Sequence, residues 1–237
     1  MPLAVVTGAG QRLGRAIALG LAARGYAVGL HYHASAQAAE EAAAEIRAQG
    51  GQAFLAQADL RDAEQIARLF AQVDGWGRPL RVWVNSAAVM PAQDADTMAA
   101  EDWDAVMDLN LRAPFLCAQQ AAQRMDSGGV IINLSDSGAV KAWSGFPAYT
   151  VSKAGVEALT RVLARRWGPR VRVNAVAPGL ILRGEMTSAE EWQSLTGRLP
   201  MRTGGGPQDV VRAVAFLIEN PYITGETLVV DGGYRLI

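Results

Sequence analysis

Short apolar runs alternate along the chain with longer stretches in which apolar residues recur at helical spacing. The short runs are rich in Val and Ile and do not alternate with polar residues, as in parallel strands buried on both faces: 3–6, 27–30, 53–55, 82–84, 130–134, 171–176 and 228–230. The longer stretches predict helices near 13–24, 36–49, 63–73, 103–125, 148–167 and 207–218. This alternation predicts one α/β domain over residues 1–237, with a Rossmann-type, doubly wound parallel sheet of about seven strands and helices on both faces.

One long segment interrupts this pattern. Residues 180–206 show weak periodicity and end in three consecutive glycines. Loops of that length in compact domains often cover a substrate. We therefore expect a substrate loop or lid over about 180–206, with an ordinary surface excursion as the alternative.

Composition narrows the class of partner. Lys and Arg total 22 against 23 Asp and Glu, so no nucleic-acid or membrane-surface partner is favoured. The single cysteine, Cys117, excludes an intrachain disulfide and suits a reducing compartment. The first residues lack the basic and apolar regions of a secretory signal, and no apolar stretch is long enough to span a bilayer. We expect a cytoplasmic protein.

A glycine-rich turn, residues 7–14, follows the first predicted strand and opens the first predicted helix. Small residues there let backbone N–H groups and the helix N-terminus approach a pyrophosphate. The turn therefore predicts dinucleotide binding, although such a turn can also be a plain tight connection. Arg12 replaces the middle glycine of the usual fingerprint, where it could reach a phosphate or the substrate, or simply be solvated.

The end of the second predicted strand indicates which dinucleotide binds. A cofactor with a free ribose 2′-hydroxyl usually meets an acid here, and none is present in residues 30–35. His31, Tyr32, His33 and Ser35 can instead donate hydrogen bonds to a 2′-phosphate. NADP(H) is therefore favoured over NAD(H). A metal site at the two histidines is not expected, because no third ligand is evident.

A carboxylate and a Tyr-Lys pair supply candidate proton chemistry. Tyr149 and Lys153 are four residues apart, which places them on one face of a helix. The lysine ammonium is expected to lower the pKa of the phenol, which makes the pair a proton donor and acceptor. Asp136 precedes Tyr149 by 13 residues, at the carboxyl end of a predicted strand, where open α/β sheets bind ligands.

These motifs resemble the short-chain dehydrogenase/reductase family over essentially the whole chain. Besides the turn and the Tyr-Lys pair, the resemblance rests on Asp59-Leu60, 85–88, Asn110, Pro178-Gly179 and 231–233. It implies catalysis by Asn110, Asp136, Tyr149 and Lys153, with Asn110 anchoring a structural water and proton relay. It implies cofactor contacts from Gly8, Arg12, Leu13, Gly14, Tyr32, His33, Ser35, Asp59, Leu60, Asn85, Ala87, Tyr149, Lys153, Pro178 and Gly179.

Within this family the chain is most similar to pteridine reductases and dihydromonapterin reductases. Arg12, the segment 31–35 and Asp136 carry that resemblance, and it implies that Arg12 and Asp136 face the substrate. Met90, however, stands where this subgroup has an aromatic ring that stacks on the pterin. The pocket is therefore expected to be reshaped for a different ring, with substrate contacts from Arg12, Met90, Asp136, Trp143 and Tyr149.

Two further departures from the subgroup are visible. Ala34 occupies a position where an arginine is common, and Ala88 replaces a serine that contacts the substrate. The resemblance also implies a homotetramer, a dimer of dimers, in which the long helices pair between subunits. Small and apolar residues on the predicted helices would permit close packing: Ala118, Ala121, Ala122, Ala154, Ala158 and Leu159.

Asp136 replaces the serine of the general family, and this favours one kind of substrate. Hydride addition to a ketone leaves negative charge on oxygen, which a hydroxyl stabilises and a carboxylate repels. A C=N bond reacts as an iminium or a protonated ring nitrogen, and a carboxylate stabilises that cation. We therefore expect an NADPH-dependent reductase of a C=N bond in a heterocycle, either a dihydropterin-like compound or a cyclic imine.

Two alternatives stay open. One is an NADPH-dependent carbonyl reductase or alcohol dehydrogenase that accommodates Asp136. The other is a non-catalytic NADP(H)-binding sensor or scaffold, which Asn110, Tyr149 and Lys153 argue against because a pure binder has little need of a proton relay.

Overall fold

A parallel sheet forms the centre of the molecule in the computed structural model, which describes residues 1–141, 143–184 and 187–237. Seven strands are found in this part of the chain, in the order β3-β2-β1-β4-β5-β6-β7. Their bounds are β1 Leu3–Val6, β2 Ala27–Tyr32, β3 Ala53–Gln57, β4 Leu80–Asn85, β5 Gly129–Leu134, β6 Val171–Pro178 and β7 Thr227–Val230. All neighbouring strands pair in parallel, so their carboxyl ends share one edge.

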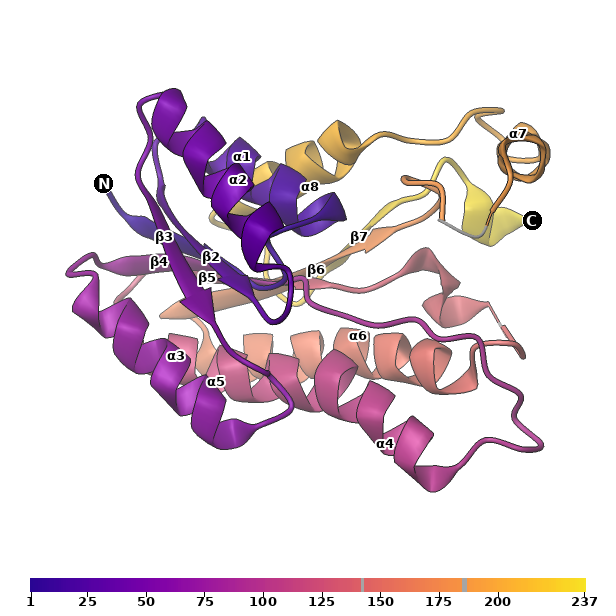
Figure 1. Cartoon of the computed structure of the whole chain (residues 1–237), viewed down its shortest axis with the longest axis horizontal. Helices are drawn as coiled ribbons and strands as arrows, with labels where there is room; N and C mark the ends of the chain where they lie inside the picture. The colour runs from indigo at the N-terminus through magenta and orange to yellow at the C-terminus, as the bar shows by residue number, and fades with distance from the viewer. Residues whose placement is uncertain (142, 185–186) are drawn as a thin grey trace.

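Helices cover both faces of the sheet (Figure 1). One face carries α1 Arg12–Ala22, α2 Ala36–Ala48 and α8 Pro207–Glu219. The other carries α3 Ala63–Gly75, α5 Ala113–Arg124 and α6 Pro147–Trp167, with α4 Ala100–Met107 beyond the sheet edge. The buried side chains form one apolar cluster on each face. The predicted fold class is therefore confirmed.

The predicted helix over 103–125 is divided in the structure. A π-helical turn, Asp108–Arg112, separates α4 from α5. One wider turn changes the spacing of apolar residues very little, so the apolar pattern of the sequence does not reveal it. Such turns are frequent at functional sites, and this one carries Asn110, which is fully buried.

Helix α7, Ala189–Gly197, lies inside the predicted lid and was not predicted as a helix. It is short and has a weak apolar face, so its pattern is faint. A capping box stabilises its start: the Ser188 hydroxyl accepts a hydrogen bond from Glu191 N–H, and the Glu191 carboxylate accepts one from Ser188 N–H. Residues 185–186 of the predicted lid lie outside the described residues.

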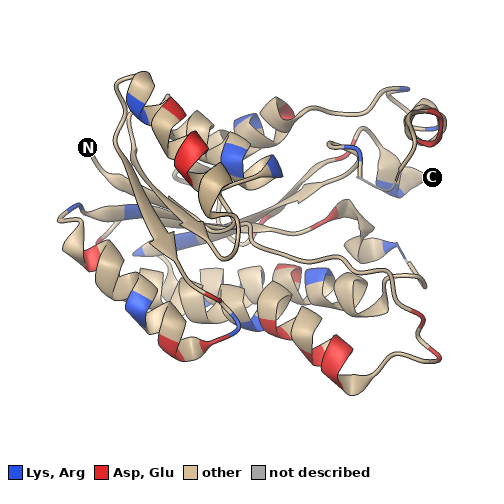
Figure 2. Cartoon of the chain, in the orientation of Figure 1, with Lys and Arg blue, Asp and Glu red and all other residues tan. Residues whose placement is uncertain are grey.

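The topology places a crevice where the strand order reverses. β1 pairs with β2 on one side and with β4 on the other, so the connections leave the sheet in opposite directions at their carboxyl ends. Acidic and basic residues are interspersed on the helices, whereas most of the sheet carries neither (Figure 2). Among the described residues, no helix combines the length and the apolarity needed to cross a membrane.

Candidate active site

A cleft of about 1000 Å³ opens at the carboxyl ends of the strands. Most residues that the sequence predicts as cofactor or substrate contacts line it: Gly8, Arg12, Leu13, Gly14, Tyr32, His33, Ser35, Asp59, Leu60, Ala87, Met90, Asp136, Trp143, Tyr149, Lys153, Pro178 and Gly179. Asn85 and Asn110 are not among the lining residues. The structure thus brings together, in one cavity, residues from both halves of the chain.

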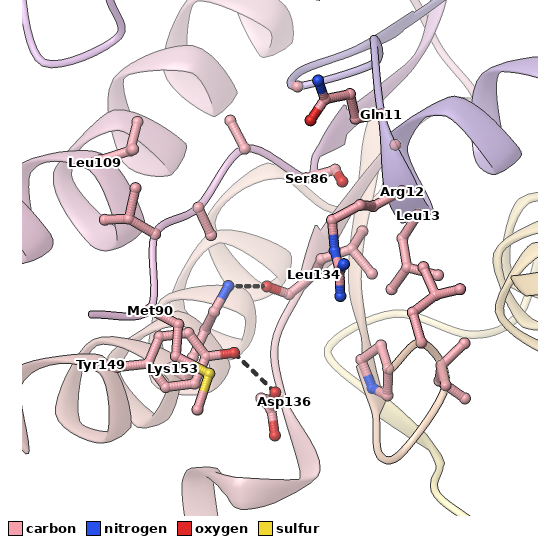
Figure 3. A pocket seen from close by; sticks show the side chains of 18 of the residues that line it. Gln11, Arg12, Leu13, Ser86, Met90, Leu109, Leu134, Asp136, Tyr149 and Lys153 are labelled. Atoms are coloured by element: carbon pink, nitrogen blue, oxygen red, sulfur yellow. Dashed lines mark hydrogen bonds between the residues drawn. The ribbon is translucent and has the colours of Figure 1, made fainter. Parts of the chain in front are cut away.

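The glycine-rich turn folds tightly on itself at one end of the cleft. Gly8 has a φ of +64°, and a Cβ at Gly14 would collide with the Gly8 carbonyl oxygen. Arg12 adopts a φ of +49°, in the left-handed region of backbone conformation. A residue other than glycine adopts that conformation at a cost of roughly 1–2 kcal/mol. This backbone explains why a glycine suits the position of Arg12. The Arg12 guanidinium points into the cleft (Figure 3), where it can meet an anionic group.

His31 fixes the turn to the end of β2. Its Nδ1 accepts a hydrogen bond from Gly8 N–H at 3.2 Å, and its Nε2 lies 3.0 Å from the Ala58 carbonyl oxygen. Those two contacts require the neutral ring with its proton on Nε2. Burial lowers the pKa of His31 to about 4. The expectation that His31 donates to a 2′-phosphate is therefore wrong, because both ring nitrogens are already engaged.

The rest of the segment after β2 stays open to the cleft. The His33 side chain is 56% exposed and lies 3.8 Å from the Asp59 carboxylate. Arg61 holds that carboxylate at 2.6 Å through Nη2, and hydrogen bonding to Arg61 lowers the pKa of Asp59 to about 2. Arg61 thus offsets the charge of Asp59 beside the segment. The donors of this region fit a phosphorylated ribose.

Asn85 lies in a buried polar network behind the cleft. Its Oδ1 accepts a hydrogen bond from Trp83 Nε1 at 2.7 Å. Its Nδ2 donates to Asn133 Oδ1 at 2.8 Å and to the Pro114 carbonyl oxygen at 3.2 Å. These contacts occupy both ends of the amide, so the side chain joins β4 to β5 and α5. A direct contact between Asn85 and the cofactor stays a prediction.

Asn110 fixes the loop that carries Met90. Its Oδ1 accepts from Val89 N–H at 2.9 Å, and its Nδ2 donates to the Val89 carbonyl oxygen at 2.8 Å and to Ser152 Oγ at 3.2 Å. The buried amide therefore ties the loop after β4 to α6. In this structure Asn110 is a positioning residue, and its role in a water-mediated proton relay stays a prediction.

The carboxylate and the Tyr-Lys pair meet at the other end of the cleft (Figure 3). The Tyr149 hydroxyl donates to Asp136 Oδ2 at 2.7 Å, and Asp136 Oδ1 accepts from Gly138 N–H at 2.6 Å. Lys153 Nζ donates to the Leu134 carbonyl oxygen at 2.8 Å. Asp136 follows β5, while Tyr149 and Lys153 lie on α6, so strand and helix together build the site.

Burial controls the acidity of these groups. It raises the pKa of Asp136 above its ordinary value and lowers that of Lys153 to about 8. The pKa of Tyr149 is raised by burial and by the neighbouring Asp136 carboxylate. The expectation that Lys153 lowers the phenol's pKa is therefore wrong for this arrangement. The ammonium lies 5.7 Å from the ring centroid, and its hydrogen bond goes to the backbone.

Several lining residues were missed by sequence reasoning. Trp192 and Leu195 come from α7, the helix that the sequence pattern did not reveal. Tyr234 comes from a short 3₁₀ turn, Tyr234–Leu236, after β7. Its position directly after the 231–233 motif was the available signal. Among the described residues, no group of three or more His, Cys, Asp and Glu could hold a metal ion.

Known proteins match this chain over nearly all its length. The family model described as enoyl-(acyl carrier protein) reductase matches residues 8–235. The 3-oxoacyl-[acyl-carrier-protein] reductase FabG of Staphylococcus aureus is 38% identical over 238 residues, covering 97% of this chain and 96% of that protein.

Two solved structures superimpose closely. FolM alternative dihydrofolate reductase 1 from Brucella suis, in complex with NADP, is 31% identical with a TM-score of 0.94, covering 100% of this chain and 95% of that one. A blue fluorescent protein from a metagenomic library, in complex with NADPH, is 34% identical with a TM-score of 0.92, covering 98% and 97%.

Proposed function

Because the chain belongs to the short-chain dehydrogenase/reductase family, we propose that it reduces a C=N bond in a heterocycle with hydride from NADPH. The substrate is a dihydropterin-like compound or a cyclic imine. The protein is an NADP-dependent oxidoreductase of this family. The observation that carries the proposal of C=N reduction is the half-buried Asp136 carboxylate, 2.7 Å from the Tyr149 hydroxyl.

The residues of the cleft fit the cofactor. NADPH, when bound, supplies the hydride. The glycine-rich turn would bind the pyrophosphate. Without Cβ atoms at Gly8 and Gly14, the backbone of the turn packs tightly and its N–H groups can come close to the phosphates. His33, Tyr32 and Ser35 would hold the 2′-phosphate, since no acid ends β2 and Arg61 binds the nearby Asp59. Structures of FolM and the blue fluorescent protein with NADP and NADPH support this choice.

Asp136 favours a cationic substrate. Reduction of a C=N bond adds hydride to carbon and a proton to nitrogen, and the reactive form carries positive charge. A partly buried carboxylate stabilises that charge, whereas it would repel the developing oxyanion of a ketone. The backbone N–H of Gly138 holds Asp136 in place, at 2.6 Å.

Tyr149 and Asp136 together hold the proton. The phenol donates to the carboxylate at 2.7 Å, so a proton can pass between these two oxygens and on to a substrate nitrogen placed beside them. The raised pKa of Asp136 makes protonation of the carboxyl more accessible at neutral pH. Lys153, fixed by the Leu134 carbonyl oxygen, keeps an ammonium within the same site and would orient the cofactor ribose.

A carbonyl reductase is the second candidate function. The 3-oxoacyl-[acyl-carrier-protein] reductase FabG, 38% identical, is named for a ketone substrate. In that case the Tyr149 hydroxyl would protonate the alkoxide, and Asp136 would need to be protonated to avoid repelling it. The raised pKa of Asp136 is the feature that would permit this.

A substrate panel separates the two candidates. Dihydrobiopterin, a pyrroline and a 3-oxoacyl thioester are each offered with NADPH, and its absorbance is followed. We expect turnover of at least one C=N substrate well above that of the thioester. A reversed order would reject C=N reduction in favour of carbonyl reduction. The same mixtures without protein are the control for non-enzymatic oxidation of NADPH.

We also propose that the described parts of the predicted lid, residues 180–184 and 187–206, close over the substrate. Gly205 N–H donates to the Leu180 carbonyl oxygen at 2.9 Å, which joins the two ends of this segment. From α7, Trp192 and Leu195 reach the cleft lining. Amide exchange in α7 should slow when NADP⁺ and dihydrobiopterin are both bound, and unchanged exchange would argue against closure.

We further propose a homotetramer on two exposed apolar surfaces. On α6, Val151 is 47% and Val162 is 64% exposed, and their spacing places them on one face. Across the molecule, Phe216 of α8 is 48% exposed and Tyr222, before β7, is completely exposed.

The small residues divide between interior and surface. Ala118, Ala121 and Ala122 are buried against this chain's own core, so they cannot pair subunits as the sequence suggested. Ala154 and Ala158 are exposed on α6 and remain available for packing.

A further inference from the structure

The turn after β7 aims one aromatic side chain at the cleft. Asp231 Oδ1 accepts from Gly233 N–H at 2.8 Å, and Oδ2 accepts from Arg235 N–H at 2.9 Å. Gly233 has a φ of +87°, and a Cβ there would press on the Pro200 ring. The chain therefore reverses at a fixed point, and Tyr234, the next residue, lines the cleft.

Lys141 contacts both the backbone and the ring of Tyr234. Its Nζ donates to the Tyr234 carbonyl oxygen at 3.0 Å and to the Ile237 main-chain oxygen at 2.6 Å. The same ammonium lies 4.0 Å from the centroid of the Tyr234 ring, within the range of a cation–π contact. Backbone and ring are thus fixed by one side chain, which the proton chemistry does not use.

A second aromatic ring joins Tyr234 to the catalytic carboxylate. The ring centroids of Trp143 and Tyr234 are 6.1 Å apart. Trp143 packs directly on Gly138, where any Cβ would collide with its ring, and Gly138 N–H binds Asp136. Burial and the charge of the Asp136 carboxylate both raise the pKa of the Tyr234 phenol.

We propose that Tyr234 is a specificity-determining residue that packs against a planar ring substrate, and that Lys141 is the residue that positions it. The inference rests on the proposed function, since it assigns the contact for the substrate ring beside Asp136. Met90 offers no aromatic surface, and the Tyr234–Trp143 pair supplies one from a different part of the chain.

Equilibrium binding tests this without requiring turnover. Dihydrobiopterin is titrated by calorimetry into the protein saturated with NADP⁺, which lacks a hydride to transfer. Tyr234→Leu should weaken its binding about tenfold, whereas Tyr234→Phe, which keeps the ring, should stay within about twofold of the original protein. Tyr26→Leu is the matched control, because Tyr26 directly precedes β2 and is not among the residues that line the cleft, and it should leave the affinity unchanged.

Two further measurements distinguish positioning from general damage. Lys141→Met should weaken dihydrobiopterin binding by about threefold, and adding it to Tyr234→Leu should cause no further loss, because coupled residues are not additive. For a pyrroline, a small ring without aromatic character, KM should change by less than about twofold in Tyr234→Leu. NADPH affinity, measured in each variant, should be unchanged.

The outcomes separate this inference from the proposed function. Equal dihydrobiopterin affinity in Tyr234→Leu and the original protein would overturn the inference, as would a complete lack of binding by the original protein. If dihydrobiopterin binds and depends on Tyr234, but no C=N substrate is reduced, the inference stands and the proposed C=N reduction fails.

Discussion

Acid should lower the stability of this protein through His31, the residue that joins the glycine-rich turn to β2. Burial holds the pKa of His31 at about 4, against 6.5 for an exposed histidine. Between those two pH values His31 is protonated in the unfolded chain and neutral in the folded chain. The free energy of unfolding therefore falls as pH falls through this window. This pKa difference corresponds to a total loss of about 3 kcal/mol in the free energy of unfolding, of which about 2 kcal/mol is lost between about pH 7 and pH 5.

The assay is urea unfolding at these two pH values for the original protein, His31→Gln and His33→Gln. Glutamine keeps one donor and one acceptor but does not titrate. His31→Gln should be less stable near pH 7, because Gly8 N–H and the Ala58 carbonyl oxygen lose well-placed partners. It should, however, lose about 2 kcal/mol less than the original protein on acidification. Groups that titrate in both proteins, including Asp59, cancel in this difference.

His33→Gln is the matched control. The His33 side chain is 56% exposed and stands two residues further along the chain. It should keep the acid sensitivity of the original protein, within about 0.5 kcal/mol, as exposed substitutions usually do. If the original protein and His31→Gln lose the same stability between the two pH values, the neutral, doubly engaged imidazole is the wrong description of His31.

Three other predictions concern the cofactor, the proton and the assembly. Tyr149→Phe should lower turnover about 10²–10⁴-fold while NADPH titrations stay unchanged; retained turnover would move proton delivery to Asp136 or water. NADPH should bind much more tightly than NADH, and Ala34→Asp should shift the preference toward NADH by repelling the 2′-phosphate; paired titrations that show no preference in the original protein would remove the claim. Val162→Glu should dissociate the tetramer in light scattering, and a monomeric original protein at micromolar concentration would contradict it.

The sequence predicted the sheet well for physical reasons. Strands buried on both faces must be apolar, and that requirement is visible in the inner strands β1, β2, β4, β5 and β6. The edge strands β3 and β7 are only partly buried, although their runs are also mostly apolar. The boundaries of α1, α2, α3, α6 and α8 lie close to those predicted from apolar residues at helical spacing. The π-helical turn at Asp108–Arg112 and the short helix α7 escaped, because neither changes the local apolar pattern enough to be recognised.

Site residues were predicted where chemistry depends on residue type, and missed where it depends on three-dimensional placement. Tyr149 and Lys153 are recognisable by spacing, and the structure places both beside Asp136. Nothing in the sequence reveals that His31 is buried while His33 is exposed. Residues two apart in one strand share a face, and the two differ because β2 ends at Tyr32, between them. The acidity of Tyr149 was misjudged because burial, which the sequence does not show, and the neighbouring Asp136 carboxylate both raise the pKa of the phenol.

The central claim is that the Asp136 carboxylate stabilises a cationic C=N substrate. The most direct test is kcat/KM for one C=N and one C=O substrate, across a range of pH, in the original protein, Asp136→Asn and Asp136→Ser. We predict that both substitutions lower C=N reduction and that Asp136→Ser spares or raises C=O reduction, because its hydroxyl can donate to the oxyanion. If the two substrates respond alike, or if C=N reduction is unchanged in Asp136→Asn, the carboxylate does not have this role.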